Sequence, residues 1–299
     1  MVKISFIIVN FNTSDLLIKC IGNLLGIHKN MEIIVVDNGS TDGSADRIEK
    51  KYGKKITLIR TKNKGISAGN NLGIKKSSGD YLIYVGTDAF PRQDALKKLI
   101  KYMDESSDVG IVTPKLVLRD GTTDLHAHRG FPTPWNSMAH FLSLNKMFPK
   151  SKLFNQYYME YEDLNTAHEI DLCISHFMVM KKEVINKIGK WDENFWVYGE
   201  DVDICYRTKE AGYKIMYLGN VEVLHYKGAG VGRKETADLS NASRDSKESM
   251  KKLARSTSSV MRMFYKKHLS KKYPFFVNWA AYIAIFVMSK IRILMSSSK

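Results

Sequence analysis

The stretch Met31–Ser44, MEIIVVDNGSTDGS, joins an apolar run directly to an acidic turn. Residues 33–36 are Ile, Ile, Val and Val, an uninterrupted β-branched run that favours a strand covered on both faces in a parallel sheet. Asp37 follows at the carboxyl end of that strand, where open α/β sheets bind their ligands. Residues 38–40 predict a tight turn before a helix capped near Ser40. Asp37 is therefore a candidate binding residue, although the turn alone leaves a simple capping role open.

The neighbouring segments repeat this order of strand, polar turn and helix. Residues 4–9, 55–60 and 81–85 are further short apolar runs, and segments with helical periodicity separate them. We therefore predict an α/β protein with a doubly wound, mixed and mainly parallel sheet flanked by helices. The turn after the first strand, Asn10–Thr13, lacks the G-x-G-x-x-G pattern of dinucleotide-binding folds, which argues against a redox enzyme.

Strands are also expected in the second part of the chain. Residues 109–118 predict a strand pair that leads into a hairpin-like turn at 119–122. One strand is predicted over 170–180, and two more over 213–218 and 221–224. Residues 126–167 have no clear period, and their loose aromatic cluster fits either loop packing or contact with a sugar.

Composition places the chain among globular proteins, with 299 residues, 44% of them hydrophobic and 26% charged. The net charge is +15, and residues 244–299 supply +11 of it, from 13 Lys and Arg against two acids. This charge lies beside an apolar segment rather than within a recognised nucleic-acid-binding pattern, so no nucleic-acid partner is expected. The three cysteines lack a C-x-x-C pattern and are expected to be reduced core residues. Residues 1–12 do not resemble a secretory signal, which favours a cytoplasmic protein.

Two more polar segments adjoin predicted strands. Asn63–Gly73, NKGISAGNNLG, combines glycines with amides, which lets a polar ligand approach the backbone and opens a helix whose first N–H groups favour an anion. Gly86, Thr87 and Asp88 follow the strand at 81–85 and place a second carboxylate at a strand end. A single aspartate there is either a helix cap or a metal ligand.

The order of these motifs resembles glycosyltransferase family 2, the inverting enzymes with a nucleotide-sugar-binding GT-A fold, and especially bacterial rhamnosyltransferases. The resemblance implies that Asp37 contacts the nucleotide base and that Asp88 holds a divalent cation, Mg²⁺ or Mn²⁺, on the diphosphate. Gly86 stands where the family usually has the first acid of Asp-x-Asp, so metal dependence stays open. The matching segments are residues 7–12 (IIVNFN), 37–44 (DNGSTDGS), 63–73 (NKGISAGNNLG), 80–91 (DYLIYVGTDAFP) and 195–207 (FWVYGEDVDICYR).

The resemblance also implies roles for the remaining site residues. Asp201 corresponds to the catalytic base, which removes the proton of the acceptor hydroxyl. His225 lies where many members place a residue at the metal or diphosphate. Acids are also common at helix starts, and a histidine at a strand end is often structural, so both alternatives stay open. The implied set is Asn10, Asn12, Asp37, Asn63, Gly65, Asn70 and Asp88 for the nucleotide sugar, Asp88 and His225 for the metal, and Trp196, Tyr198 and Glu200 for the acceptor.

The last part of the chain differs in kind. Residues 250–264 have helical periodicity with Lys and Arg on the other faces, and residues 274–288, PFFVNWAAYIAIFVM, are apolar apart from Asn278. This apolar run is shorter than the roughly 20 residues of a spanning helix. We predict that it lies on an anionic membrane surface, with packing on the catalytic domain or on a partner as the alternative.

The predicted organisation is a glycosyltransferase domain at residues 1–230 and a basic helical C-terminal region at 231–299. Within the domain, residues 1–115 would bind the nucleotide sugar and residues 116–230 the acceptor. The expected enzyme moves a sugar from dTDP-rhamnose or a UDP-sugar to a hydroxyl of a glycan or lipid-linked acceptor. It would act in cell-surface polysaccharide assembly, as a cytoplasmic protein peripheral on the inner face of the cell membrane.

Two other functions, and the oligomeric state, stay open. One function is a non-catalytic basic protein that binds nucleic acid or a membrane. The other is a nucleotidyltransferase, which should carry a glycine-rich loop with Arg or Lys after the first strand, and Asn10–Thr13 has none. A homo-oligomer is compatible with the sequence.

Overall fold

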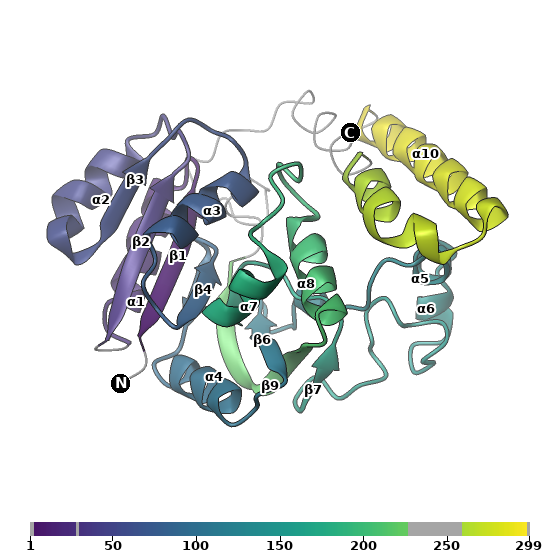
Figure 1. The fold of residues 1–299 in the computed structure, drawn as a ribbon, viewed down its shortest axis with the longest axis horizontal. Helices are drawn as coiled ribbons and strands as arrows, with labels where there is room; N and C mark the ends of the chain where they lie inside the picture. Colours follow the sequence, from purple (N-terminus) through teal and green to yellow (C-terminus); the bar gives the residue numbers. More distant parts are fainter. Residues whose placement is uncertain (1–2, 28–29, 227–258, 298–299) are drawn as a thin grey trace.

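The computed structural model describes residues 3–27, 30–226 and 259–297 (Figure 1). Its centre is a nine-stranded sheet in the order β3-β2-β1-β4-β8-β6-β9-β5, with β7 paired to β9. The strands are β1 (Ile4–Asn10), β2 (Met31–Asp37), β3 (Thr57–Arg60), β4 (Tyr81–Val85), β5 (Ala89–Pro91), β6 (Val109–Val117), β7 (Ala167–Ile170), β8 (Phe177–Lys181) and β9 (Lys214–His225). The helices are α1 (Ser14–Leu24), α2 (Ser44–Tyr52), α3 (Ile66–Lys76), α4 (Ala95–Asp104), α5 (Pro134–Phe141), α6 (Leu144–Met147), α7 (Lys182–Ile188), α8 (Glu200–Glu210) and α10 (Phe275–Ser297).

The predicted βα order gives the parallel pairing of the first half of the sheet. β3, β2, β1 and β4 are parallel neighbours. β8 then runs antiparallel to both β4 and β6, and β9 is parallel to β6 but antiparallel to β5 and β7. The described strands therefore form four parallel and four antiparallel pairs. The sheet is mixed as predicted, but it is mainly parallel only in its first half.

Three strand predictions in the second half are wrong in their extent. Residues 109–117 form one strand rather than a pair, because the chain passes Pro114 with a register shift against β9 and stays in the sheet. Residues 170–180 are divided between β7 and β8, because the backbone of Leu172 pairs with Arg129 between them. The two strands expected over 213–224 form the single strand β9.

The side chains of β1 alternate between two apolar layers. Ile4, Phe6 and Ile8 belong to the cluster that α1, α2 and α4 cover, whereas Ile7 belongs to the cluster on the other face, with α3, α7 and α8. This alternation is the period of two expected of a strand. Because β1, β2 and β4 are parallel, the turns that follow them lie at the same edge of the sheet, between the two layers of helices.

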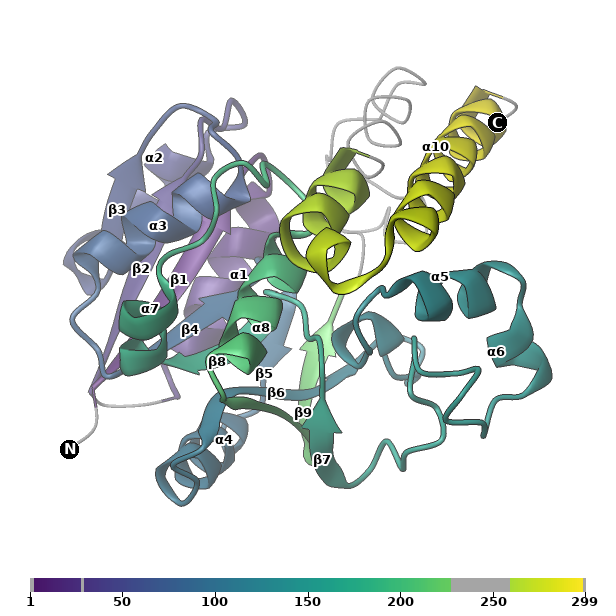
Figure 2. The same ribbon diagram turned by 45° about the vertical axis from the view of Figure 1, so that its right-hand side comes forward.

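The C-terminal segment 259–272 packs into the second of these layers. Its residues Val260, Phe264, Tyr265 and Leu269 are buried in the same cluster as α8. Figure 2 shows the segment lying against α8 and leading through a turn into α10. Residues 259–272 therefore pack on the domain. The predicted helical residues 250–258, and the predicted domain boundary at 230, lie outside the described residues.

Helix α10 has one face toward the protein and one toward solvent. Its partly buried Tyr282 and Ile285 pack against the cluster around α8. Asn278, the polar interruption of the apolar run, accepts a hydrogen bond from Tyr265 Oη at 2.7 Å and so joins α10 to the preceding segment. Among the residues described, no helix is both long and apolar enough to cross a membrane. The large exposed apolar side chains of α10 are Phe275, Phe276, Trp279, Ile283, Phe286 and Val287.

Candidate functional site

Asn10 and Asp37 lie side by side where two parallel strands end. They are register partners of β1 and β2, and both are buried. Asn10 Nδ2 donates to Asp37 Oδ1 at 2.9 Å and to Ser40 Oγ at 3.0 Å. The other oxygen, Asp37 Oδ2, accepts from the Ser40 backbone N–H at 3.2 Å. These bonds fix the turn after β2, so Asp37 has the structural role that the sequence left open, and its contact with a nucleotide base stays a prediction.

The predicted nucleotide-binding residues of the next loops are tied to this turn. Asn12, with φ at +54°, accepts from the Thr41 backbone N–H at 2.7 Å. Asn38 donates to Asn63 Oδ1 at 3.2 Å and to the Gly65 carbonyl at 3.1 Å. The three polar turns therefore form one continuous edge. Asn70 is also buried, on α3, and its Nδ2 has no hydrogen-bond partner among the described residues.

Gly65 brings this edge together with the predicted acceptor residue Trp196. Its φ is +88°, and a Cβ atom there would lie 2.4 Å from the Trp196 carbonyl oxygen, so only glycine fits. The next backbone N–H, that of Ile66, donates to the same carbonyl at 2.8 Å. The Trp196 and Tyr198 side chains are 46% and 37% exposed, which leaves them accessible to a ligand.

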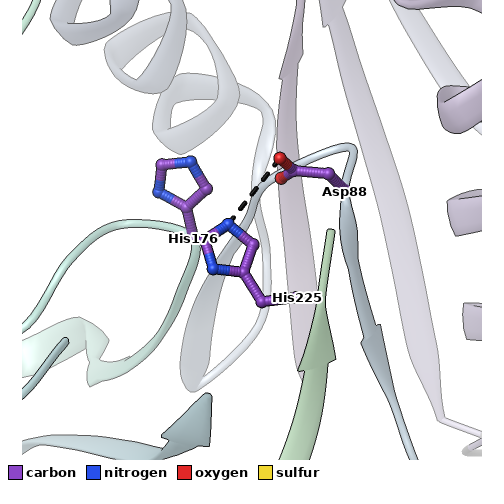
Figure 3. Close-up of side chains that lie close together, drawn as sticks. All are labelled: Asp88, His176 and His225. Atoms are coloured by element: carbon purple, nitrogen blue, oxygen red, sulfur yellow. Dashed lines mark ion pairs between the residues drawn. The ribbon is translucent and has the colours of Figure 1, made fainter. Parts of the chain in front are cut away.

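A second group of side chains joins Asp88, His176 and His225 (Figure 3). Asp88 follows β4, His176 directly precedes β8, and His225 ends β9. One donor atom from each lies within 4.8 Å of the others. Asp88 and His225, the two predicted metal residues, thus lie close together, and their binding of a metal stays a prediction. The sequence reasoning missed His176, because a lone histidine before an apolar strand becomes visible only once β8 is known to pair with β4.

Asp124 orients His225 toward Asp88. Its Oδ2 lies 3.1 Å from His225 Nδ1, so Nδ1 carries the proton and Nε2 points to Asp88 Oδ2, 3.7 Å away. A carboxylate that fixes the far nitrogen of a histidine in this way is typical of metal-binding histidines. Asp124 is also held in place, since its Oδ1 contacts His126 Nδ1 at 3.0 Å.

The charges of this group are strongly coupled. Burial opposes the charged form of Asp88, but His225 and His176 outweigh it and lower the pKa of Asp88 below its ordinary value. Burial also opposes the charged form of His225, yet Asp124 and Asp88 raise the pKa of His225 to about 9. Burial lowers the pKa of His176, which keeps that imidazole neutral near pH 7. One carboxylate thus faces one charged and one neutral imidazole.

The three side chains fit a divalent cation. His225 Nε2 is a buried nitrogen without a hydrogen-bond partner among the described residues. Donors that bind one ion at about 2.1 Å lie at most about 4.2 Å apart, so a spread of 4.8 Å closes with small side-chain rotations. Binding of a cation would satisfy His225 Nε2 and would displace the proton from His225.

Glu200 and Asp201 begin α8, directly after Tyr198 and Gly199, which both have positive φ. Glu200 is buried, and burial together with the charge of Asp201 raises the pKa of Glu200 well above its ordinary value. This shift favours the protonated form of Glu200. Asp201 is the other carboxylate of the pair and the one that the sequence predicts as the base.

Arg129 connects Asp201 with the group around Asp88. Its Nη2 lies 3.9 Å from Asp201 Oδ2, and its Nε donates to the His126 carbonyl at 2.9 Å. Since His126 also contacts Asp124, one chain of polar contacts runs from Asp201 to His225. Arg129 was missed because it lies in the segment without sequence period.

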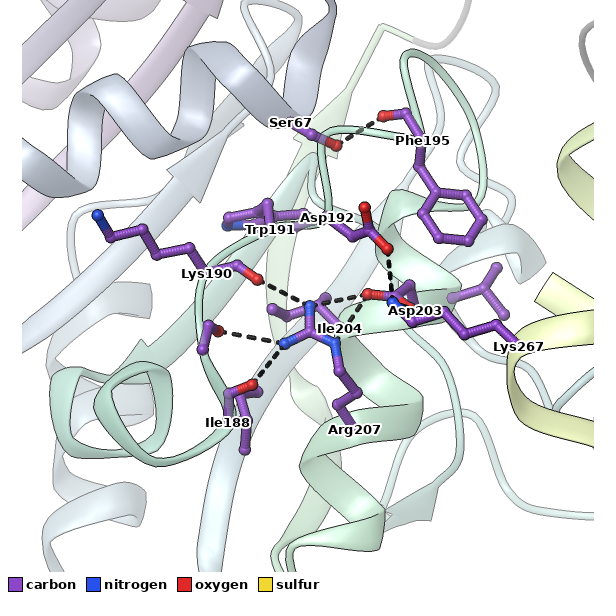
Figure 4. A network of polar contacts seen from close by, with 12 residues as sticks. Ser67, Ile188, Lys190, Trp191, Asp192, Phe195, Asp203, Ile204, Arg207 and Lys267 are labelled. Atoms are coloured by element: carbon purple, nitrogen blue, oxygen red, sulfur yellow. Dashed lines mark hydrogen bonds and ion pairs between the residues drawn. The ribbon is translucent and has the colours of Figure 1, made fainter. Parts of the chain in front are cut away.

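A polar network behind α8 holds Asp203 (Figure 4). The Asp203 side chain is fully buried and lies 2.8 Å from Arg207, 2.6 Å from Lys267 and 2.7 Å from His268. Burial opposes its charge, but His268, Arg207 and Lys267 lower the pKa of Asp203 to about 2. Through Lys267 and His268, the C-terminal segment thus binds α8, the helix that begins with Glu200 and Asp201.

The segment also touches the turn immediately before α8. A Cβ atom on Gly199 would lie 2.3 Å from Val260 Cγ1, so this turn and the C-terminal segment are in direct contact. On the other side, Ser67 Oγ of α3 donates to the Phe195 carbonyl at 2.7 Å. The loop that leads to Asp201 is therefore held between α3 and the C-terminal segment 259–272.

The chain is similar in sequence to known proteins. The family model described as Glycosyl transferase family 2 matches residues 5–189. The rhamnosyltransferase WbbL of Escherichia coli (strain K12) is 26% identical over 231 residues, which cover 74% of this chain and 82% of the relative. An uncharacterized glycosyltransferase of Rickettsia bellii is 36% identical over 107 residues, 35% of this chain, and the match spans only 16% of that relative.

A solved structure shows the same fold over almost the whole chain. It is the mannosyltransferase PcManGT from Pyrobaculum calidifontis in complex with GDP-Man and Mn²⁺, with a TM-score of 0.59 and 15% sequence identity. The superposition covers 99% of this chain and 73% of the mannosyltransferase. The predicted GT-A-like sheet with helices on both faces is confirmed at the level of the fold.

Proposed function

Because this chain belongs to glycosyl transferase family 2, we propose that it transfers a sugar from a nucleotide-diphosphate donor to an acceptor hydroxyl, with inversion. The observation that carries the proposal is the placement of Asp201 and the Asp88 group at one edge of the sheet, joined through Arg129. A base and a group able to hold a cation are the two parts that such a displacement needs. The division into residues 1–115 for the donor and 116–230 for the acceptor belongs to this proposal.

In the proposed reaction, Asp201 accepts the proton of the acceptor hydroxyl. The hydroxyl oxygen forms a bond to the anomeric carbon from the face opposite the nucleotide, and the bond from that carbon to the diphosphate oxygen breaks with its electron pair on the diphosphate. Asp88, His225 and His176 would hold a divalent cation, which would supply positive charge to offset the charge that develops there. Arg129 restrains the position of Asp201 through its fixed guanidinium.

For the donor, we propose a deoxythymidine- or uridine-diphosphate sugar, with dTDP-rhamnose first. The support is the similarity to the rhamnosyltransferase WbbL across most of both chains. Asn10, Asn12, Asp37, Asn63, Gly65 and Asn70 would bind the nucleotide around the polar edge, with Asp88 at the diphosphate. The small turns there leave backbone N–H groups close to an anion at the start of α3.

For the acceptor, we propose a glycan or a lipid-linked glycan at the cytoplasmic face of a membrane. The support is α10, whose exposed aromatic and aliphatic side chains lie beside exposed Lys271, Lys272 and Lys290. Aromatic and basic residues together favour an anionic lipid surface. Trp196, Tyr198 and Glu200 would contact the acceptor near Asp201.

A panel of nucleotide sugars tests the proposal with the full chain. Each is incubated with Mn²⁺ and a short glycan acceptor, and released nucleotide and glycosylated product are measured. Turnover of one donor that yields nucleoside diphosphate supports the proposal. Release of pyrophosphate from a nucleoside triphosphate and a sugar phosphate would indicate a nucleotidyltransferase, and no turnover with tight polynucleotide binding would indicate a basic binding protein.

A further inference from the structure

Gly86 is a glycine because of space, not because of backbone conformation. It is absent from the glycines with positive φ, so its backbone suits any residue. A Cβ atom on residue 86 would lie 2.9 Å from His176 Cδ2 and 2.9 Å from Asp88 Oδ1, closer than real side chains approach. A side chain at position 86 would therefore force the imidazole of His176 or the carboxylate of Asp88 to shift.

Strand pairing fixes His176 in that space. β8 runs antiparallel to β4 with Val85 opposite Phe177, and the Gly86 backbone N–H donates to the His176 carbonyl at 2.9 Å. The His176 and His225 ring centroids are 4.8 Å apart. His176 is thus held beside Asp88 from a different strand.

One ring nitrogen of His176 lies within 4.8 Å of the donor atoms of Asp88 and His225. Figure 3 shows the His176 ring beside these two side chains, with Nε2 on the side nearer Asp88. The donor atom of His225 is Nε2, which is buried without a hydrogen-bond partner within the described part of the chain, since Asp124 engages Nδ1. Two imidazole nitrogens and one carboxylate therefore face the same small volume.

This donor set discriminates among divalent cations. Mg²⁺ takes oxygen ligands in a near-ideal octahedron and gives up its waters reluctantly. Imidazole nitrogen binds first-row transition ions far better than it binds Mg²⁺, and a carboxylate suits Mn²⁺ as well as Mg²⁺. A site with two imidazole nitrogens and one carboxylate should consequently have a higher ratio of Mn²⁺ to Mg²⁺ affinity than a site with one imidazole and two carboxylates.

We propose that His176 is a metal ligand of this chain and that, together with Gly86, it makes the site select Mn²⁺ over Mg²⁺. The inference rests on the divalent-cation site of the proposed function, and it names the residue pair that decides which ion occupies it. His176 replaces, from β8, the ligand that residue 86 cannot supply from the turn after β4.

The test measures binding of the metal alone to the full chain. Isothermal titration with MnCl₂ and with MgCl₂, each repeated in the presence of inorganic pyrophosphate, gives the ratio of the two affinities. His176→Ala should weaken Mn²⁺ binding at least about tenfold and Mg²⁺ binding much less, so the ratio falls. His168→Ala, which removes an imidazole outside this cluster, should leave both affinities unchanged. Equal Mn²⁺ affinity of wild-type protein and His176→Ala would overturn the proposal, as would a wild-type protein that binds no Mn²⁺ in either titration.

A spectroscopic readout separates ligation from folding. Pulsed EPR of bound Mn²⁺ should detect two coupled imidazole nitrogens in the wild-type protein and one in His176→Ala. A wild-type spectrum with a single imidazole would overturn the assignment even if the variant folds poorly. The double variant Gly86→Asp with His176→Gly exchanges the donors, and its ratio of Mn²⁺ to Mg²⁺ affinity should fall below that of the wild-type protein. An unchanged ratio would contradict the proposal.

The result is independent of the transfer assay. If a nucleotide sugar is turned over but His176 makes no difference to metal binding, the metal inference fails and the proposed function stands. If His176 sets the metal preference but no donor is turned over, the proposed function fails and the metal site stands.

Discussion

The two carboxylate corners of the site are built in different ways. Asp88 and its histidines stand at the ends of β4, β8 and β9, which belong to one sheet, so strand register brings them together and Asp124 orients His225. Asp201 stands at the start of a helix, and its position depends on contacts with α3 on one side and with residues 259–269 on the other. The metal corner is therefore held by strand pairing, whereas the base corner is held in part by the C-terminal segment.

This difference predicts which changes are local and which act from a distance. Substitutions at the metal corner should alter ion and diphosphate binding without unfolding the sheet. Substitutions in the C-terminal segment should reach the base through α8 and should leave donor binding nearly intact.

The largest effect is expected at the base itself. Asp201→Asn keeps the shape of the side chain but cannot accept a proton, so transfer should fall about 10²- to 10⁴-fold with donor binding preserved. Initial rates of product formation and the donor Kd measure the two quantities. Because burial and the charge of Asp201 favour the protonated form of Glu200, Glu200→Gln should lower the transfer rate much less. A reversed order of the two variants would move the base to Glu200.

The metal corner should show the next largest effect. A chelator should lower transfer about 10²- to 10³-fold by removing the charge that stabilises the leaving diphosphate, and Mn²⁺ should restore it. Asp88→Ala should weaken the binding of nucleoside diphosphate in the presence of metal. Full transfer in excess chelator would mean that the chain's own cationic side chains stabilise the diphosphate without a metal.

Substitution of a buried phenylalanine should weaken the docking of the C-terminal segment, and an exposed phenylalanine provides the control. Phe264 is 1% exposed and lies beside Tyr206 of α8, whereas Phe276 on α10 is 61% exposed. Phe264→Ala should cost about 3–5 kcal/mol of unfolding free energy and should lower the transfer rate more than donor affinity. Phe276→Ala should change stability by less than about 0.5 kcal/mol. Urea unfolding followed by tryptophan fluorescence measures both, and equal losses would mean that residues 259–269 do not stabilise the domain.

Much of the first half of the fold was predictable because it is local. β1, β2 and β4 were identified from apolar runs, and Asp37 and Asp88 were identified because they directly follow such strands. The order of βα units then fixed the parallel pairing. What could not be predicted is pairing between distant segments, since nothing near His176 or Arg129 indicates which strand or carboxylate each one meets.

The contacts of the C-terminal segment were also not predictable from the sequence. Its helical period was evident, but in the sequence Lys267 and His268 look like members of a solvated basic face. They are partners of the buried Asp203, 64 and 65 residues away in the sequence. Charge pattern alone does not distinguish a cation that faces solvent from one that neutralises a buried acid.

The pH dependence of stability tests this buried contact. The folded-state pKa of Asp203 is about 2, below its ordinary value of 3.8, so the ionised form stabilises the fold. That contribution is fully present above about pH 5 and is lost as the pH falls through 2, and it amounts to about 2 kcal/mol. The stability difference between wild-type protein and Asp203→Asn should therefore shrink by this amount on acidification. Asp46→Asn, at an exposed ion pair, should show no comparable trend.

The smallest effect per residue is expected for membrane binding by the exposed face of α10. This face is the part of the described C-terminal region that does not pack on the domain. Attraction to anionic lipid contributes about 1 kcal/mol per Lys near the surface, and burial of Trp279, 70% exposed in solution, adds an apolar term. Raising the salt should weaken capture by anionic vesicles without full release, because screening leaves apolar burial in place. Trp279→Ser should reduce co-sedimentation with both anionic and neutral vesicles, whereas Phe141→Ser, at an exposed residue of α5, should not.

The same variant can be tested for transfer. Since Asn278 and Tyr265 couple α10 to the segment that packs on α8, Trp279→Ser should lower transfer to a lipid-linked acceptor more than transfer to a short soluble acceptor. Equal recovery of the two variants from vesicles would leave α10 as a surface for another protein or a second copy of the chain.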